Sequence, residues 1–199
     1  MMLSYLEEIQ VNFVRETKET KIDISINLYG KGVSNINSGV GFLDHMLEAF
    51  SKHSGIDLDL KCVGDTYIDD HHSVEDIGIV IGQAINKSLY PIKNIERYGN
   101  ATVVMDEASI SCDIDISNRP FLVFELPIDG KVGNFDCELV EEFFRAFTLN
   151  SSITMHLIYN RGKNRHHIIE GAFKALAVSL RRAIAINNNM GIPSTKGVI

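Results

Sequence analysis

The motif HHxxE occurs twice in this chain of 199 residues, as His71-His72-Ser73-Val74-Glu75 and as His166-His167-Ile168-Ile169-Glu170. A His and a Glu four residues apart lie on one face of an α-helix, because 3.6 residues complete a turn. Imidazole nitrogen and carboxylate oxygen together are good ligands for a divalent transition metal. Each copy opens an apolar helical stretch, so the sequence predicts a paired metal site that arose by duplication.

The duplication extends beyond the motif. His45 aligns with Glu142, 97 residues further on, within the matching stretches 41–50 and 138–147. The next stretches, 54–60 and 151–157, keep this offset, and the two motifs lie 95 residues apart (71 to 166), which requires an indel of two residues. We therefore expect two half-repeats, residues 1–97 and 98–199, merged into one globular unit.

Candidate metal ligands occupy matched positions in the two halves. They are His45, His71, His72, Glu75, Glu142, His166, His167 and Glu170. Adjacent helical residues point about 100° apart, so the two histidines of each motif are expected to bind different ions. A lone His–His pair is more often exposed polar surface, and a lone His–Glu pair is usually a helix-stabilising contact. Repetition of both at a matched offset favours two ions with four protein ligands each.

The hydrophobic pattern predicts an α+β fold of two sheets, each of about four antiparallel or mixed strands with two helices on one face. Helices are expected at 42–52, 71–89, 138–147 and 166–187. Strands are expected within 11–29, interrupted by a polar connection at 16–21, and at 56–63, 101–105, 108–116, 121–125 and 153–159, whereas 30–41 is expected to be a loop. Gly78 and Gly82 cost helix propensity and are predicted to permit close packing against a neighbouring element.

Composition excludes several classes of function. The net charge of −7 argues against a nucleic-acid surface, and the few local basic residues suit one small anion. No apolar run reaches the roughly 20 residues of a membrane span. Residues 1–8 lack the features of a signal peptide, and Cys62, Cys112 and Cys137 form no CxxC motif, so we expect buried thiols in a reducing cytoplasm.

Six motifs together resemble the imidazoleglycerol-phosphate dehydratase family of histidine biosynthesis over nearly the whole chain. They are GVGFLDHML at 39–47, DDHHSVED at 69–76, ERYG at 96–99, DISNRP at 115–120, NRHHIIE at 164–170 and PSTKGV at 193–198. The resemblance implies a lyase that dehydrates D-erythro-1-(imidazol-4-yl)glycerol 3-phosphate to 3-(imidazol-4-yl)-2-oxopropyl phosphate through a metal-bound imidazolate or diazafulvene intermediate. It also implies two halves of the ribosomal-S5-domain-2-like type, two Mn²⁺ per active site, and a homo-oligomer of 24 subunits built from trimers, with sites shared between subunits.

Carried over residue by residue, the resemblance implies two ligand sets. One ion would be held by His45, His72, His166 and Glu170, and the other by His71, Glu75, His167 and the residue at position 142. Family members often have His at this last position. Glu142 stands there in this chain; a carboxylate suits manganese, although an ordinary surface Glu beside Glu141 is the alternative. Asn118 stands where Gly is common, and Asn tolerates the left-handed backbone conformation.

The same resemblance supplies candidates for catalysis and substrate binding. Glu19, Glu75 and Glu170 are the candidate bases for the carbon proton, and the choice between them stays open. His45 and His72 would act through the metals, and Glu19 is also placed against the substrate. Phosphate-binding candidates are Arg97, Arg119, Ser194, Thr195 and Lys196. The alternatives are a dinuclear-metal phosphoester hydrolase and a metal store or scaffold without enzymatic activity.

Overall fold

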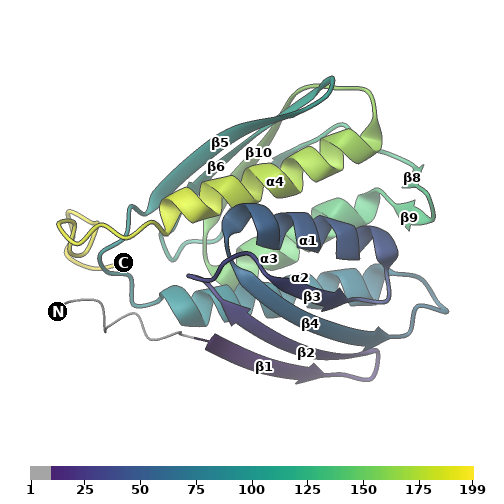
Figure 1. The fold of residues 1–199 in the computed structure, drawn as a ribbon, viewed down its shortest axis with the longest axis horizontal. Helices are drawn as coiled ribbons and strands as arrows, with labels where there is room; N and C mark the ends of the chain where they lie inside the picture. The colour runs from purple at the N-terminus through teal and green to yellow at the C-terminus, as the bar shows by residue number, and fades with distance from the viewer. Residues whose placement is uncertain (1–9) are drawn as a thin grey trace.

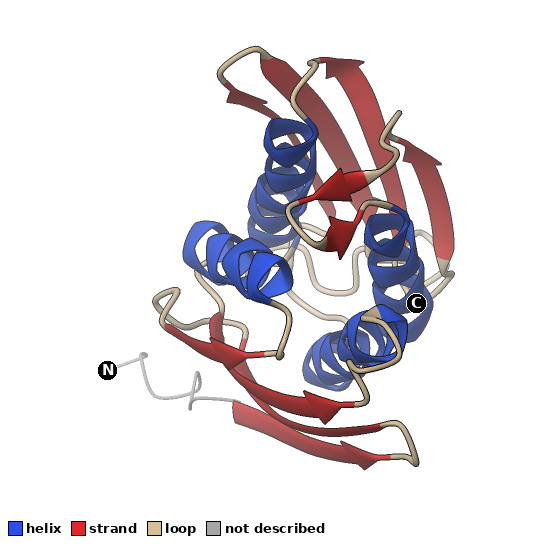
Figure 2. Ribbon diagram, turned by 90° about the vertical axis from the view of Figure 1, so that its right-hand side faces the viewer, coloured by secondary structure: helices blue, strands red, loops and turns tan. Residues whose placement is uncertain are grey.

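The computed structural model describes residues 10–199 as two four-stranded sheets that enclose a layer of four helices (Figure 1). Figure 2 shows the same layers after a rotation of 90°, with the sheets on the outside and the helices between them. Residues 1–8, which were expected to lack a signal peptide, lie outside the described residues. None of the described helices combines the length and the apolar composition needed to cross a membrane.

The two halves of the chain have the same topology. The first sheet has the order β1-β2-β4-β3 and the second has the order β5-β6-β10-β7, so in each half the strands run first, second, fourth, third. In each sheet the third strand is parallel to the fourth, and the other pairs are antiparallel. This repetition confirms the expected α+β fold of two duplicated half-domains.

The elements of the first half are β1 (Gln10–Glu16), β2 (Thr20–Asn27), β3 (Ser34–Asn37), α1 (Gly41–Ser54), β4 (Asp57–Gly64) and α2 (His71–Leu89). Those of the second half are β5 (Tyr98–Met105), β6 (Ala108–Asp115), β7 (Phe121–Glu125), α3 (Glu138–Ser151), β10 (Thr154–Arg161) and α4 (Arg165–Ala183). A small hairpin of β8 (Lys131–Val132) and β9 (Phe135–Asp136) is inserted before α3 and has no counterpart among residues 10–97.

Side-chain alternation explains the sheets. In β2 the side chains of Ile22, Ile24 and Ile26 are buried, and the residues between them face outward. The helices end in equivalent ways. Gly55 follows α1 with φ of 79°, and Ser152, at the matched position 97 residues on, follows α3 with φ of 57°. A non-glycine residue in this left-handed conformation costs roughly 1–2 kcal/mol, so the second half keeps the turn at a cost that the first half avoids.

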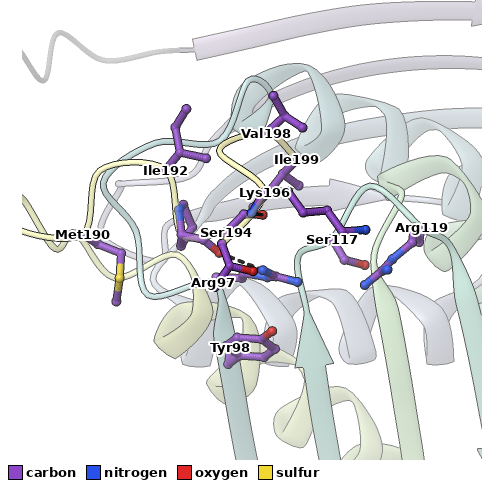
Figure 3. Close-up of a pocket in the computed structure, with 12 residues that line it drawn as sticks. Arg97, Tyr98, Ser117, Arg119, Met190, Ile192, Ser194, Lys196, Val198 and Ile199 are labelled. Carbon is purple, nitrogen blue, oxygen red and sulfur yellow. Dashed lines mark hydrogen bonds between the residues drawn. The ribbon is translucent and has the colours of Figure 1, made fainter.

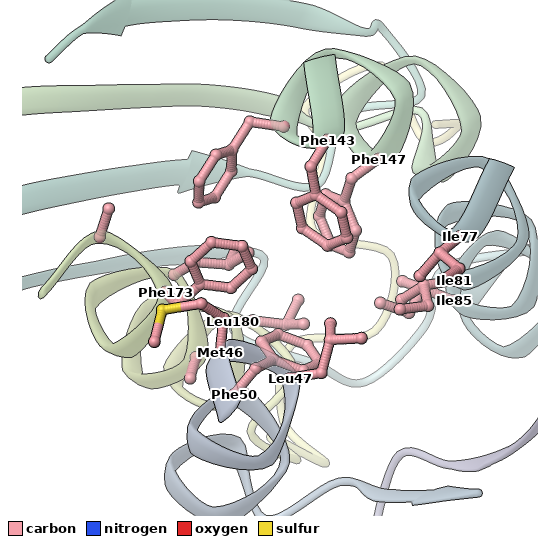
Figure 4. Close-up of a cluster of buried hydrophobic side chains, with 14 of the residues drawn as sticks. Met46, Leu47, Phe50, Ile77, Ile81, Ile85, Phe143, Phe147, Phe173 and Leu180 are labelled. Atoms are coloured by element: carbon pink, nitrogen blue, oxygen red, sulfur yellow. The ribbon is translucent and has the colours of Figure 1, made fainter. Parts of the chain in front are cut away.

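The helices pack closely across the two halves. A methyl group on Gly78 would lie 2.8 Å from the backbone oxygen of Phe143, and one on Gly82 would lie 2.7 Å from that of Phe147. The predicted close packing at these glycines is therefore confirmed, and α3 is the partner. Aromatic rings continue the contact into the centre (Figure 4), where the ring centroids of Phe143 and Phe173 are 5.0 Å apart.

The observed elements differ from the expected ones in several details. The segment 30–41 contains β3, a short edge strand whose residues Ser34-Asn35-Ile36-Asn37 are too polar for a strand pattern. The hairpin β8–β9 was not expected, because each of its strands has only two residues. Helix α4 ends at Ala183 and not at 187, since the following Asn187-Asn188-Asn189 favours turns over helix.

Candidate active site

Three candidate ligands converge where α1 and α4 begin. The Nε2 atoms of His45 and His166 lie 3.5 Å and 3.1 Å from Oε2 of Glu170, and one ligand atom from each residue lies within 4.8 Å of the others. Glu170 is buried, whereas His45 is exposed and His166 half-buried. Two imidazole nitrogens and one carboxylate oxygen in this arrangement fit a divalent transition metal with room for further ligands.

Lys174 fixes the orientation of the Glu170 carboxylate. Its Nζ lies 2.6 Å from Oε1, which leaves Oε2 to face the two histidines. Burial alone raises the pKa of Glu170, but the hydrogen bond and charge of Lys174, together with His45 and His166, outweigh it and lower the pKa. The group is therefore an anionic oxygen donor at neutral pH. Sequence reasoning missed Lys174, although its i,i+4 spacing from Glu170 was a readable signal.

The first motif places its two histidines against different partners. At the start of α2, Nε2 of His71 lies 3.8 Å from Oε2 of Glu75. The ring of His72 lies at 86° to that of His71. Nδ1 of His72 is 3.1 Å from both carboxylate oxygens of Asp65, and its Nε2 is 3.7 Å from Oε1 of Glu19. The hydrogen bond to Asp65 raises the pKa of His72 against the opposing effect of desolvation.

His167 in the second motif has an equivalent carboxylate partner. Its Nδ1 lies 2.8 Å from Oε2 of Glu107, in the turn between β5 and β6. Oε1 of Glu107 accepts the backbone N–H groups of Asn164 at 2.8 Å and Lys163 at 3.0 Å. The Asn164 hydrogen bond, followed by those of His167 and Lys163, lowers the pKa of Glu107 to about 2. Sequence reasoning missed Asp65 and Glu107, and no local signal links Glu107 to a histidine 60 residues away.

Within one chain the eight candidate ligands thus fall into separate groups. His45, His166 and Glu170 form one group and His71 and Glu75 another, whereas His72 and His167 each face a carboxylate of their own. Glu142 is half-buried on α3 and forms no ion pair with any residue between 10 and 199. A cleft of about 610 Å³ beside His45 brings the beginnings of α1 and α2 together with the β8–β9 hairpin. These groups therefore share one end of the molecule.

The five candidate phosphate-binding residues lie together at another place. Arg97, Arg119, Ser194, Thr195 and Lys196 line one cleft of about 710 Å³ (Figure 3). Nε of Arg97 donates to Asp115 at 2.7 Å and its Nη1 donates to the backbone oxygen of Pro193 at 2.7 Å, so this arginine anchors the C-terminal segment. The side chain of Arg119 is 69% exposed and its Nη2 lies 3.7 Å from Asp115. Asn118, the neighbour of Arg119, has the left-handed backbone conformation, with φ of 55°. This conformation was expected because Asn stands where Gly is common.

The cleft and the ligand groups lie at opposite ends of α4. The backbone N–H of Arg97 donates to Ala183 at the C-terminal end of the helix, whereas His166 is at its start. Seventeen helical residues span about 25 Å. Figure 1 shows this separation, with the C-terminal segment on the left and the start of α4 on the right. A substrate the size of a small sugar phosphate cannot contact both ends of one chain.

Comparison with known proteins identifies the relatives of this chain. The sequence model of the imidazoleglycerol-phosphate dehydratase family matches residues 38–180. An imidazoleglycerol-phosphate dehydratase of Sulfurovum sp. strain NBC37-1 is 72% identical over 95% of this chain and all of its own length. That of Sulfurimonas denitrificans is 63% identical over 93% of this chain and 97% of its own.

Two solved structures of imidazoleglycerol-phosphate dehydratases have the same fold as this chain. The crystal structure from Staphylococcus aureus subsp. aureus N315 superposes with a TM-score of 0.82 at 43% identity and covers 90% of this chain and 100% of its own. The crystal structure from Pyrococcus furiosus, in complex with (S)-C348, superposes with a TM-score of 0.81 at 35% identity and covers 94% of this chain and 100% of its own.

Proposed function

This chain belongs to the imidazoleglycerol-phosphate dehydratase family and is a hydro-lyase of histidine biosynthesis, and we propose that two Mn²⁺ ions and residues of more than one subunit form its active site. The reaction breaks the C–O bond at the carbon attached to imidazole and the C–H bond of the next carbon. Water leaves, and the enol that results tautomerises to the ketone of 3-(imidazol-4-yl)-2-oxopropyl phosphate.

The cluster at the start of α4 is the observation that carries the metal proposal. His45, His166 and Glu170 would hold one ion together with His72, and His71, Glu75, His167 and Glu142 would hold the other. Glu142 is the weakest member, because it forms no ion pair with any of the other seven within one chain. The donor sets of imidazole and carboxylate suit Mn²⁺. Bound ions would supply Lewis acidity toward the imidazole ring and the substrate oxygens.

Asp65 and Glu107 would prepare two of the histidines for this role. Each accepts a hydrogen bond from the Nδ1 of its histidine, at 3.1 Å for His72 and 2.8 Å for His167. The proton is thereby held on Nδ1, and Nε2 keeps its lone pair for an ion. These carboxylates are positioning residues, because they act through the imidazole rings.

Glu19 is the best candidate for the base that removes the carbon proton. Glu170 is bound by Lys174 and two histidines, and Glu75 faces His71. The side chain of Glu19 is 53% exposed, and its Oε1 lies 3.7 Å from Nε2 of His72. A carboxylate that is not itself a metal ligand is the stronger base, so we assign proton abstraction to Glu19.

We further propose a homo-oligomer, the 24-mer of trimers implied by the resemblance, in which one subunit supplies the ligand end and another the phosphate cleft. The separation of about 25 Å along α4 supports this arrangement. Co-expression of His166→Ala and Lys196→Ala chains tests it. At substrate concentrations well below KM, His166→Ala alone should be inactive and Lys196→Ala alone should keep about one tenth of the activity or less. Mixed oligomers should recover about one quarter of the sites, since each site then needs two undamaged contributions. No recovery in mixed oligomers would contradict shared sites.

Turnover of imidazoleglycerol phosphate by chelator-treated protein, with and without added Mn²⁺, tests the metal proposal. Activity should return with about two ions bound per chain, the number that two sets of four ligands accommodate. Full turnover in metal-free protein would contradict the proposal, and release of inorganic phosphate would indicate the hydrolase instead. The three free thiols, Cys62, Cys112 and Cys137, are buried, which is consistent with the reducing cytoplasm that we propose as the location.

A further inference from the structure

A buried carboxylate ties the turn that carries Glu19 to helix α2. Asp76 follows the HHxxE motif directly and is 7% exposed. Its Oδ1 accepts Nε and Nη2 of Arg15 on β1 at 3.0 Å and 2.8 Å, and its Oδ2 accepts the hydroxyl of Thr20 at the start of β2. One side chain therefore links both strands of the β1–β2 hairpin to the helix that carries His72 and Glu75.

The turn itself leaves the Glu19 backbone little freedom. The Glu19 N–H donates to Oγ1 of Thr17 at 3.1 Å, and its carbonyl oxygen accepts the N–H of Asp65 at 3.1 Å. The N–H of Thr20 donates to the same Thr17 hydroxyl at 3.0 Å. Asp65 in turn contacts His72. The link through Thr20 and Asp76 adds to these hydrogen bonds and holds the turn against the start of α2.

The fold does not require a charge at this place. The position matched to Asp76 in the second half is Gly171, where an added methyl group would lie 3.2 Å from Ile110. The second half thus packs the same helix against the same kind of sheet with no side chain there at all. A buried ion pair contributes little net stability relative to well-packed apolar residues. Asp76 is therefore better explained by what it holds in place.

We propose that Asp76, through Thr20, is a positioning residue that sets the carboxylate of Glu19 in reach of the substrate carbon beside His72. This inference rests on the proposed role of Glu19 as the base. Catalysis by a positioned base is sensitive to small displacements, and a shift of 1 Å can reduce turnover about 10²-fold. Loss of the link lets the turn move and lowers kcat without removing any group that contacts the substrate.

A matched pair of variants at Thr20 separates positioning from folding. Thr20→Val keeps the shape and removes the hydroxyl donor, and Thr20→Ser keeps the donor. We expect Thr20→Val to lower kcat of the Mn²⁺-loaded oligomer about 10²-fold and to speed hydrogen exchange at the amides of residues 17–20. Thr20→Ser should restore turnover, because it keeps the hydroxyl. Asp76→Ala, which removes the acceptor of the Thr20 and Arg15 hydrogen bonds, should resemble Thr20→Val. Thr102→Val on β5, which removes an exposed hydroxyl bond to Ser111, is the control and keeps normal kcat.

The Glu19→Gln background shows whether the effect passes through Glu19. Thr20→Val should lower kcat no further in that background, while faster exchange at residues 17–20 persists. An equal loss of kcat in both backgrounds, or unchanged exchange in Thr20→Val, overturns the inference. Normal turnover by Glu19→Gln alone would instead refute the base assignment, and the exchange measurement would then still decide whether Asp76 positions the turn.

Discussion

Replacement of Glu107 by Gln should weaken Mn²⁺ binding while leaving the fold intact. Oε1 of Glu107 accepts the N–H groups of Lys163 and Asn164, and Oε2 accepts Nδ1–H of His167. The single carbonyl oxygen of Gln can keep both backbone donors, so its NH₂ group must then face Nδ1 of His167. Two donors cannot share a hydrogen bond, and the ring proton moves to Nε2. The nitrogen proposed as the metal ligand is then no longer available.

The expected loss of Mn²⁺ affinity follows from the hydrogen bond by which Glu107 orients His167, the proposed metal ligand. Substitution of such a partner typically costs 10–100-fold in metal affinity, and we expect about that loss for Glu107→Gln. The two backbone hydrogen bonds remain and only their charge assistance is lost, so the thermal midpoint of the metal-free protein should fall only slightly. Because its pKa is lowered to about 2, Glu107 stays charged in mild acid and its hydrogen bonds are lost only as the pH falls through that value.

Calorimetric titration of chelator-treated protein with Mn²⁺ measures the effect. Glu125→Gln, an exposed change at the end of β7, is the matched control and should bind as the wild type does. If Glu107→Gln also binds Mn²⁺ with wild-type affinity, His167 is either not a ligand or does not depend on Glu107 for its tautomer, and the reasoning fails.

Three further predictions concern packing, pH and the phosphate cleft. Gly82→Ala should destabilise the protein, because its methyl group would lie 2.7 Å from a backbone oxygen of α3. Overpacking at the upper end of about 1–3 kcal/mol exceeds the roughly 1 kcal/mol that Ala contributes as a helix former. Gly41→Ala is the control, since its methyl group meets nothing within 4 Å, and an equally high thermal midpoint of Gly82→Ala would contradict this prediction. In metal-free protein the pKa of His72 is raised, so protonated His72 stabilises the fold. This contribution is fully present below about pH 6.5 and is lost as the pH rises through the raised pKa. The difference in thermal midpoint between wild type and His72→Gln should therefore shrink as the pH becomes alkaline. Lys196→Ala should raise KM about tenfold or more through loss of a charge-assisted hydrogen bond to phosphate, with Lys163→Ala as a surface control, and an unchanged KM would place the phosphate elsewhere.

Periodicity and repetition were sufficient to predict the architecture. The HHxxE helices begin at His71 and Arg165, within a residue of the expected starts, because an apolar stripe with a period of 3.6 follows each motif. The glycines of α2 also revealed a close helix contact, since two glycines one turn apart are costly unless a neighbour requires them. The identity of that neighbour, α3, depends on how the halves pack and was not readable.

The site was predictable only where its residues carry a local signal. His45, His166 and Glu170 could be proposed from matched offsets, and the structure places them together. Asp65 and Glu107 could not, because Asp65 lies in the loop between β4 and α2 and Glu107 in the turn between β5 and β6, and an acidic residue in a loop or turn carries no local signal of a contact with a distant histidine. The separation of the ligand end from the phosphate cleft also escaped the sequence, which gives the order of motifs along the chain but not their distance in space.

The duplicated framework accounts for the different tasks of two glutamates. Glu19 lies in the β1–β2 turn and Glu107 in the equivalent β5–β6 turn, and each faces the second histidine of its motif. Both carboxylate oxygens of Glu107 accept hydrogen bonds, one of them from His167, so neither is free to accept a proton. In the first half the orienting carboxylate comes from Asp65, on a different loop, so Glu19 approaches His72 from the Nε2 side with its carboxylate uncommitted. A base must have a free oxygen, and of these two equivalent glutamates only Glu19 has one; if Glu107→Ala abolished proton abstraction while Mn²⁺ binding stayed intact, this division of roles would be wrong.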